Sequence, residues 1–208
     1  MTKASIIDRT QGAVAASTGE FAASIRKASS GANNSDGLQS IETLAQWHRV
    51  SFLLQNQSQI EWCWAAGIVN IDQFFNQTST LTQCTVANTI LSQQECCLNP
   101  SCSACDQPHS MTNALTVTAH LQMHVTRSLT YSEIKTEIDS GKPICAHISW
   151  IVSGVSEGGH LPMIIGYRDA LETLAIADPL YGLAEIDYSV FKDSYRQVGH
   201  WDESYYLK

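Results

Sequence analysis

Along this chain the period of the apolar positions changes from helical to strand-like. Between residues 63 and 120, apolar residues recur three and four positions apart, as on the buried face of a helix. From residue 121 onward, short apolar runs are separated by glycines, prolines and polar turns, as in β-strands. This order predicts an α+β fold with a helical N-terminal lobe, an antiparallel β-sheet C-terminal lobe, and the functional site in the cleft between them.

Individual elements follow from the same pattern. Val50, Phe52 and Leu54 occupy alternate positions and predict a strand. Thr82 is a suitable N-cap for a helix over residues 83–94. The other expected elements are a helix over 63–75, a helix over 111–120 with Ala114, Val117 and Leu121 facing inward, a strand over 121–126, a helix over 131–140 closed by Gly141, a buried strand over 143–152, a strand beginning at His160, strands over 174–178 and 183–188, a short helix around Phe191, and a last strand over 201–207.

Residues 1–44 lack this regularity. They are rich in Ala, Ser, Gly and Asn, and the run SSGANNSDG at 29–37 disfavours regular structure. We expect a disordered or loosely helical tail, a candidate secretion or propeptide segment, followed by one folded domain over residues 45–208.

The composition excludes several classes of partner. The formal net charge is −8 and there is no basic stripe, so nucleic acid is not an expected partner. No apolar run reaches the about 18 residues of a membrane span, and the first residues lack the apolar stretch of a secretory signal peptide. We expect secretion or translocation by a specialised bacterial system, with a cytoplasmic location as the alternative. The oligomeric state is not indicated.

Cys63 lies between two tryptophans in QSQIEWCWAA, residues 57–66, where the first long helix begins. A helix N-terminus favours negative charge, so a thiol there is biased toward its nucleophilic thiolate. The Gln57 amide, with the Cys63 backbone N–H, is a candidate donor to the oxyanion of a tetrahedral intermediate. A free cysteine is just as often a small buried hydrophobic residue, and the rest of the chain must decide between the two.

Two residues of the second half can supply the base and the orienting group that a cysteine nucleophile needs. Of the seven histidines, His160 follows two glycines before an apolar run, whereas His147 lies within a strand and is expected in the core. Asp178 ends the next strand directly before Pro179, which stops the ladder and holds the carboxylate at the sheet edge. Pro162 removes an N–H close to the histidine and predicts an edge or a bulge there.

Four motifs in this order resemble the papain-like cysteine peptidases, in particular the compact bacterial branch of staphopains and of effector peptidases from plant pathogens. The motifs are Gln57, WCWAA at 62–66, GGH at 158–160 and ADPLYG at 177–182, and the resemblance covers about residues 45–208. It implies a two-lobed thiol peptidase with Cys63 as the nucleophile, His160 as the base and later the acid, and Asp178 as the orienting residue. Gln57 would be the oxyanion donor, and Trp62 would border the substrate cleft.

The expected reaction is hydrolysis of peptide bonds in a protein or peptide substrate through a Cys63 acyl-enzyme, without a metal or cofactor. The protein is a candidate secreted effector or toxin. Glutamine deamidation or acyl transfer uses the same thioester chemistry and is one alternative. A binding module on an inactive peptidase fold is another, because a fold does not establish a function.

Five of the seven cysteines fall between positions 84 and 105, most of them in the loop ECCLNPSCSACDQPHS at 95–110, and they have two interpretations. They form a candidate zinc site, although the spacing is not that of a common zinc module. We favour disulfides, for a protein in an oxidising compartment, and expect free thiols in a reducing cytosol. The cysteines concerned are Cys84, Cys96, Cys97, Cys102 and Cys105, with His109 nearby.

Overall fold

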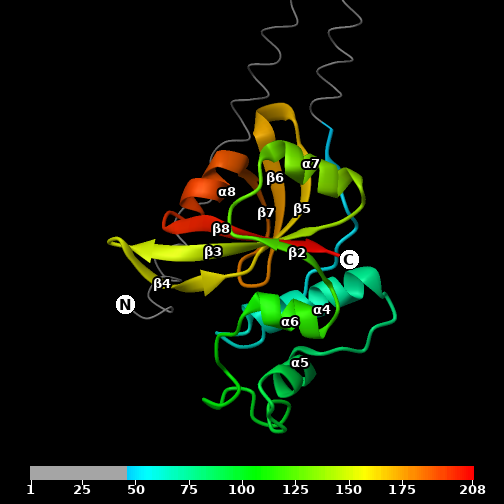
Figure 1. Cartoon of the computed structure of the whole chain (residues 1–208), viewed down its shortest axis with the longest axis vertical. Helices are drawn as coiled ribbons and strands as arrows, with labels where there is room; N and C mark the ends of the chain where they lie inside the picture. Colours follow the sequence, from blue (N-terminus) through cyan, green and yellow to red (C-terminus); the bar gives the residue numbers. More distant parts are fainter. Residues whose placement is uncertain (1–45) are drawn as a thin grey trace, which may run out of the picture. The chain divides into compact units, whose positions relative to one another are not determined.

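Five α-helices and an antiparallel sheet of eight strands make up residues 46–208, the part of the chain that this computed structural model describes (Figure 1). The predictions for the tail, residues 1–44, lie outside the described residues. The helices are α4 (Cys63–Phe75), α5 (Gln83–Ile90), α6 (Met111–Val117), α7 (Tyr131–Asp139) and α8 (Tyr188–Ser194), with a short 3-10 helix, η1 (Ala170–Glu172). The strands are β1 (His48–Arg49), β2 (Leu121–Val125), β3 (Ile144–Val152), β4 (Val155–His160), β5 (Met163–Arg168), β6 (Thr173–Asp178), β7 (Gly182–Asp187) and β8 (Gly199–Leu207).

The sheet is hydrogen-bonded in the order β2-β8-β3-β5-β6-β7, with β1 on β5 and β4 on β3. Strand β3 pairs with β5 at its first residues and with β4 at its last ones. Strands β4 and β5 therefore follow one another along the same side of β3, separated by Leu161 and Pro162. An edge or a bulge is predicted at Pro162, and the structure has a break between two strands there. The Pro162 carbonyl still accepts a hydrogen bond from the Ala146 N–H, at 3.0 Å.

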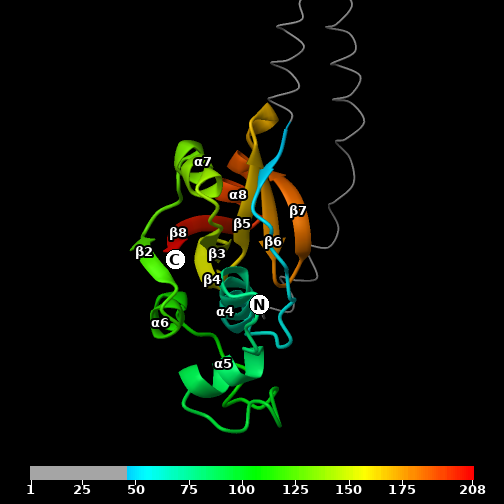
Figure 2. The ribbon, with the colours of Figure 1, turned by 90° about the vertical axis from the view of Figure 1, so that its right-hand side faces the viewer.

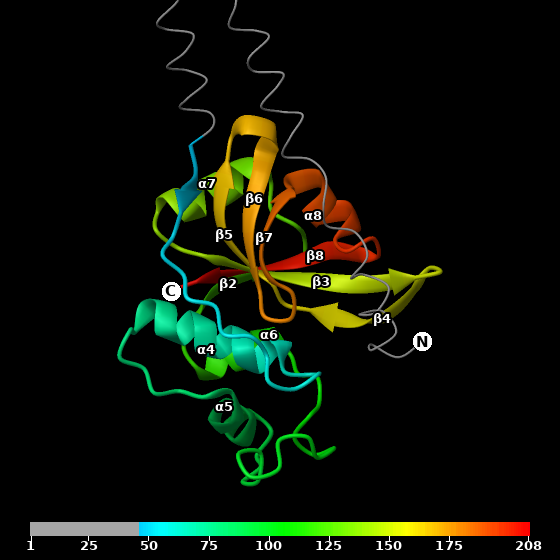
Figure 3. The ribbon, with the colours of Figure 1, turned by 180° about the vertical axis from the view of Figure 1, so that it is seen from behind.

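Helix α4 is the central buried helix. Its residues from Cys63 to Ile71 are all buried, and it belongs to one apolar cluster with Cys145, Met163 and Ala175 from the sheet. Figures 2 and 3 show α4, α5 and α6 gathered toward one end of the sheet, with α7 and α8 beside the strands toward the other end. A buried helix held on several sides gives its first residue a fixed position.

The strand predicted at Val50, Phe52 and Leu54 is not formed. These residues are partly buried against the core while Leu53 is 77% exposed, so the alternation exists without a ladder. The Val50 N–H reaches the Ile165 carbonyl, but the Gln55 backbone N–H and carbonyl bind the Asn70 side chain instead of another strand. Alternating burial therefore marks an extended segment here, not a strand.

Two predicted helices are shorter than expected. The Thr82 cap of α5 is confirmed, with a capping box to Thr85, but α5 ends at Ile90 rather than at residue 94. Helix α6 ends at Val117, whose side chain is 56% exposed, so the inward orientation predicted for it is wrong. Helix ends fray where no apolar face remains to be buried, and boundaries are the least reliable part of a pattern.

No helix within residues 46–208 has the length and the apolar character that a membrane span requires.

Candidate active site

His160 and Asp178 meet where strands β4 and β6 end. The Nε2 atom of His160 lies 2.7 Å from Oδ1 of Asp178, and the two side chains are 0% and 1% exposed. Asp178 is the last residue of β6, as predicted, whereas His160 is the last residue of β4 rather than the first residue of a strand. The register of β5 and β6 brings the two side chains together. Met163, shortly after His160, is opposite Ala177, the residue before Asp178.

Cys63 is the first residue of α4, and the predicted helix start is confirmed. Its side chain is 6% exposed and carries a free thiol. The side chain interacts with the imidazole of His160, whose Nε2 atom is held by Asp178. The remaining ring nitrogen, Nδ1, is buried and has no hydrogen-bond partner within the described residues. The arrangement leaves Nδ1 as the ring nitrogen available to the Cys63 thiol.

The electrostatics of this cluster favour an ion pair between His160 and Asp178. Burial alone lowers the pKa of His160, but the Asp178 carboxylate and the Cys63 side chain act against it and raise the pKa to about 9. Burial likewise tends to raise the pKa of Asp178, but His160 and the Tyr195 hydroxyl hold it below its ordinary value. Both shifts favour the charged forms, so the imidazole is a cation over a wide pH range.

Aromatic rings enclose the imidazole. The Trp150 ring is stacked on His160 at 5.8 Å between centroids, and the Tyr181 ring meets it edge-on at 5.9 Å. These residues come from β3 and from the turn after β6, and the sequence pattern did not identify either of them. Their contacts depend on how the strands pair in the folded sheet, and aromatic residues in strands are otherwise ordinary core residues.

Gln57 and Trp62 make contacts that the sequence did not indicate. The Nε2 group of Gln57 donates to the carbonyls of Gln59 and Ile60, each at 2.8 Å, so both amide hydrogens are already used. Trp62, expected at the border of a cleft, is 1% exposed, and its Nε1 donates to the Cys105 carbonyl at 2.7 Å. In this structure Trp62 packs in the core beside Cys63.

His147, expected in the core, is instead partly exposed on the sheet. Its Nδ1 lies 2.7 Å from Oδ1 of Asp202, which also accepts from the Ser149 hydroxyl through Oδ2. The ring of His147 lies directly over Gly159, the residue before His160. No side chain fits between them, so His147 fixes the backbone at the end of β4.

The Gly159→Ala variant is expected to disturb the candidate site. An added Cβ would lie 2.2 Å from Nε2 of His147, so either the imidazole gives up its bond to Asp202 or β4 shifts beside His160. We expect a loss of about 1–3 kcal/mol in unfolding free energy, measured by urea denaturation, and slower alkylation of Cys63. The double variant Gly159→Ala/His147→Ala opens the space and should recover part of both. Equal stability and alkylation in the single variant and the wild type would contradict this account.

Two disulfides hold the cysteine-rich loop, one to helix α5 through Cys84–Cys97 and one within the loop through Cys96–Cys105. They confirm the disulfide interpretation for four of the five cysteines. Cys102 is free, as are Cys63 and Cys145. Within residues 46–208, no group of three or more histidine, cysteine, aspartate or glutamate side chains is placed to hold a metal ion.

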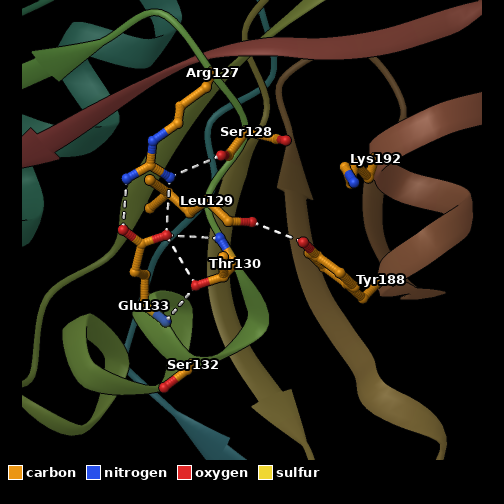
Figure 4. A pocket seen from close by; sticks show the side chains of 8 residues that line it. All are labelled: Arg127, Ser128, Leu129, Thr130, Ser132, Glu133, Tyr188 and Lys192. Atoms are coloured by element: carbon orange, nitrogen blue, oxygen red, sulfur yellow. Dashed lines mark hydrogen bonds and ion pairs between the residues drawn. The ribbon is translucent and has the colours of Figure 1, made fainter.

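A separate open pocket lies between the start of α7 and helix α8 (Figure 4). Arg127 and Glu133 form a two-point ion pair in it, and the Tyr188 hydroxyl donates to the Leu129 carbonyl. None of the predicted site residues lines this pocket, so it is not the candidate active site. Its lining consists of Arg127, Ser128, Leu129, Thr130, Ser132, Glu133, Tyr188 and Lys192.

Comparison with known proteins agrees with the chemistry of this cluster. No curated protein sequence matches the chain significantly. The model of the Peptidase_C39 like family matches residues 48–203, which include Cys63, His160 and Asp178. This match extends over most of the chain and over nearly the whole described domain. The chain therefore belongs to the Peptidase_C39 like family, a family of cysteine-peptidase type.

Proposed function

We propose that this protein is a papain-like thiol peptidase that hydrolyses peptide bonds in a protein or peptide substrate. The observation that carries the proposal is the buried His160–Asp178 pair, at 2.7 Å, with the free ring nitrogen available to a thiol at a helix N-terminus. A buried ionisable pair next to a potential nucleophile is the arrangement that cysteine-based acyl transfer requires. The helices α4 to α6 and the sheet correspond, in this proposal, to the two lobes of such a peptidase.

In the proposed reaction the sulfur of Cys63 attacks the carbonyl carbon of the scissile bond. A C–S bond forms, the carbonyl becomes an oxyanion, and the proton on Nδ1 of His160 passes to the leaving amine as the C–N bond breaks. A water molecule then attacks the thioester carbon while His160 accepts its proton. The C–S bond breaks, the acid product leaves, and Cys63 is again a thiolate beside the protonated His160. Asp178 keeps the imidazole oriented and stabilises its cationic form throughout.

The sequence indicated two donors to the oxyanion, the Cys63 N–H and the Gln57 amide, and the structure bears differently on each. Cys63 is at the first position of α4, where a backbone N–H has no partner within the helix, and this N–H is the first proposed donor. Gln57 can be the second donor only when substrate displaces one of its two backbone acceptors. The bond to Ile60 is the exposed one, so we propose that it is exchanged on binding.

The two disulfides support a function outside a reducing cytosol, and we propose that the protein is released from the cell that makes it.

The test of the proposed activity is the digestion of a peptide library by the full-length protein, with the Cys63→Ala variant beside it. New peptide termini identify hydrolysis, whereas intact peptides with altered mass would identify deamidation or acyl transfer. A library left unchanged would contradict both enzymatic functions.

The pH profile of cleavage should end on the alkaline side near pH 9. His160 must carry a proton to give to the leaving amine, and its pKa is raised to about 9 by Asp178 and Cys63 against the effect of burial. Because a raised pKa means that the proton is held below that pH and lost above it, kcat/KM should fall as the pH rises through this value. Initial rates between pH 5 and 11 in a buffer of constant ionic strength measure this alkaline fall in kcat/KM. A fall already complete near the ordinary histidine value of about 6.5 would contradict the ion pair.

A further inference from the structure

Asp178 receives a buried hydrogen bond that the proposed mechanism has not used. Its Oδ1 accepts from His160 and from the backbone N–H groups of Leu180 and Tyr181, at 2.7 and 2.9 Å. Its Oδ2 accepts from the hydroxyl of Tyr195, at 2.5 Å. Among the described residues, every partner of the carboxylate is therefore a donor, and only the tyrosine hydroxyl binds the second oxygen.

Tyr195 is itself fixed in place on several sides. It is the C-cap residue of α8, is 0% exposed, and its carbonyl accepts from the Gly199 N–H at 2.8 Å. Its ring lies against Trp150, at 6.2 Å between centroids, and meets Phe191 edge-on at 5.1 Å. Trp150 is in turn stacked on His160, so one aromatic ring contacts both the tyrosine and the imidazole.

Several titratable or charged groups face His160, Asp178 and Tyr195. Cys63 faces His160 from α4, and Tyr181 faces it from the turn after β6. The Arg196 guanidinium lies over the Tyr181 ring, at 4.4 Å, and interacts with the Tyr195 hydroxyl. Burial and the Asp178 charge raise the pKa of Tyr195, so its hydroxyl stays protonated and remains a donor.

We infer that Tyr195 is a positioning residue of the candidate site: its hydroxyl fixes the Asp178 carboxylate, and thereby the orientation of the His160 ring toward Cys63. The inference rests on the proposed function for its catalytic meaning. Without the hydroxyl, Oδ2 of Asp178 is buried with no hydrogen-bond donor, so the carboxylate attracts the imidazolium proton more strongly. The pKa of His160 should therefore rise.

The test is the full-length Tyr195→Phe variant, with Tyr188→Phe as the matched control. Tyr188 lies on the same helix, and its hydroxyl donates to a backbone carbonyl away from the site. The readout is the rate of Cys63 alkylation by iodoacetamide against pH. It is followed by the mass of the proteolytic peptide that contains Cys63, because Cys102 is also a free and partly exposed thiol. The change in this rate near pH 9, called the step below, reports the loss of the His160 proton. We expect Tyr195→Phe to move this step to higher pH and to lower kcat/KM about tenfold, as the loss of a hydrogen bond to a charged group does. Tyr188→Phe should change neither.

A second variant guards against a merely structural effect. Replacing Tyr195 with 3-fluorotyrosine keeps the ring and makes the hydroxyl a stronger donor, so the step should move to lower pH. A wild-type profile in both variants would overturn the inference, as would equal shifts in Tyr195→Phe and Tyr188→Phe. Alkylation does not require peptide cleavage, so a shifted step in a protein that cleaves nothing would support the positioning role and count against the peptidase alone.

Discussion

Cys63→Ala is expected to abolish peptide cleavage while the protein stays folded. Without a sulfur no acyl-enzyme can form, and the oxyanion donors and the His160–Asp178 pair alone supply little catalysis. We expect kcat to fall on the order of 10⁴-fold or more, measured by the release of new peptide termini. Alanine fills most of the space of a thiol that is 6% exposed, so the thermal midpoint should change little.

The other free thiols provide the controls. Cys102 is a free cysteine in the loop, and Cys102→Ala should cleave at the wild-type rate. An epoxide thiol probe should label Cys63 in the wild type and nothing at Cys145, which is fully buried. Cleavage by Cys63→Ala, or its loss in Cys102→Ala, would assign the nucleophile elsewhere.

The positions of the proposed nucleophile, base and orienting residue could be predicted because each has a local signal. Cys63 stands where the apolar period of α4 begins, and Asp178 stands before a proline that ends a strand. His160 lies beside the interruption that Pro162 creates. Such signals depend on the chain within a few residues, which is the range that a sequence pattern describes.

The surroundings of these residues could not be predicted in the same way. Tyr195, Trp150 and His147 make contacts with Asp178, Tyr195 and Asp202, which lie on elements that are far from them in the chain. Nothing in their own neighbourhoods distinguishes them from core or surface residues. The register shift in β3 opposite β8 brings Asp202 to His147, and a single-residue shift of this kind decides which face a side chain takes. The bonds that occupy the Gln57 amide are likewise visible only in the folded backbone.

The segment around Cys63 is tied to the cysteine-rich loop by three hydrogen bonds to consecutive residues. The Trp62 Nε1 donates to the Cys105 carbonyl at 2.7 Å, and the Trp64 Nε1 donates to the Gln107 carbonyl at 3.0 Å. Between them, the Glu61 N–H donates to Oδ1 of Asp106 at 2.8 Å. The Cys96–Cys105 disulfide holds Cys105, the first of these three loop residues. The disulfide therefore supports the short loop segment that binds Trp62 before Cys63 and Trp64 after it.

Removing this disulfide should therefore affect both stability and the site. For Cys96→Ser/Cys105→Ser we expect a loss of about 2–4 kcal/mol in unfolding free energy, by urea denaturation, and slower alkylation of Cys63 under conditions where the variant is folded. The matched variant Cys84→Ser/Cys97→Ser removes the other disulfide, and it should lose comparable stability with a smaller effect on alkylation. Equal alkylation in the two folded variants would mean that the loop supports the fold only. If the difference is found, strong reductants act in two opposed ways, because they keep Cys63 reduced while they break the disulfide that positions it.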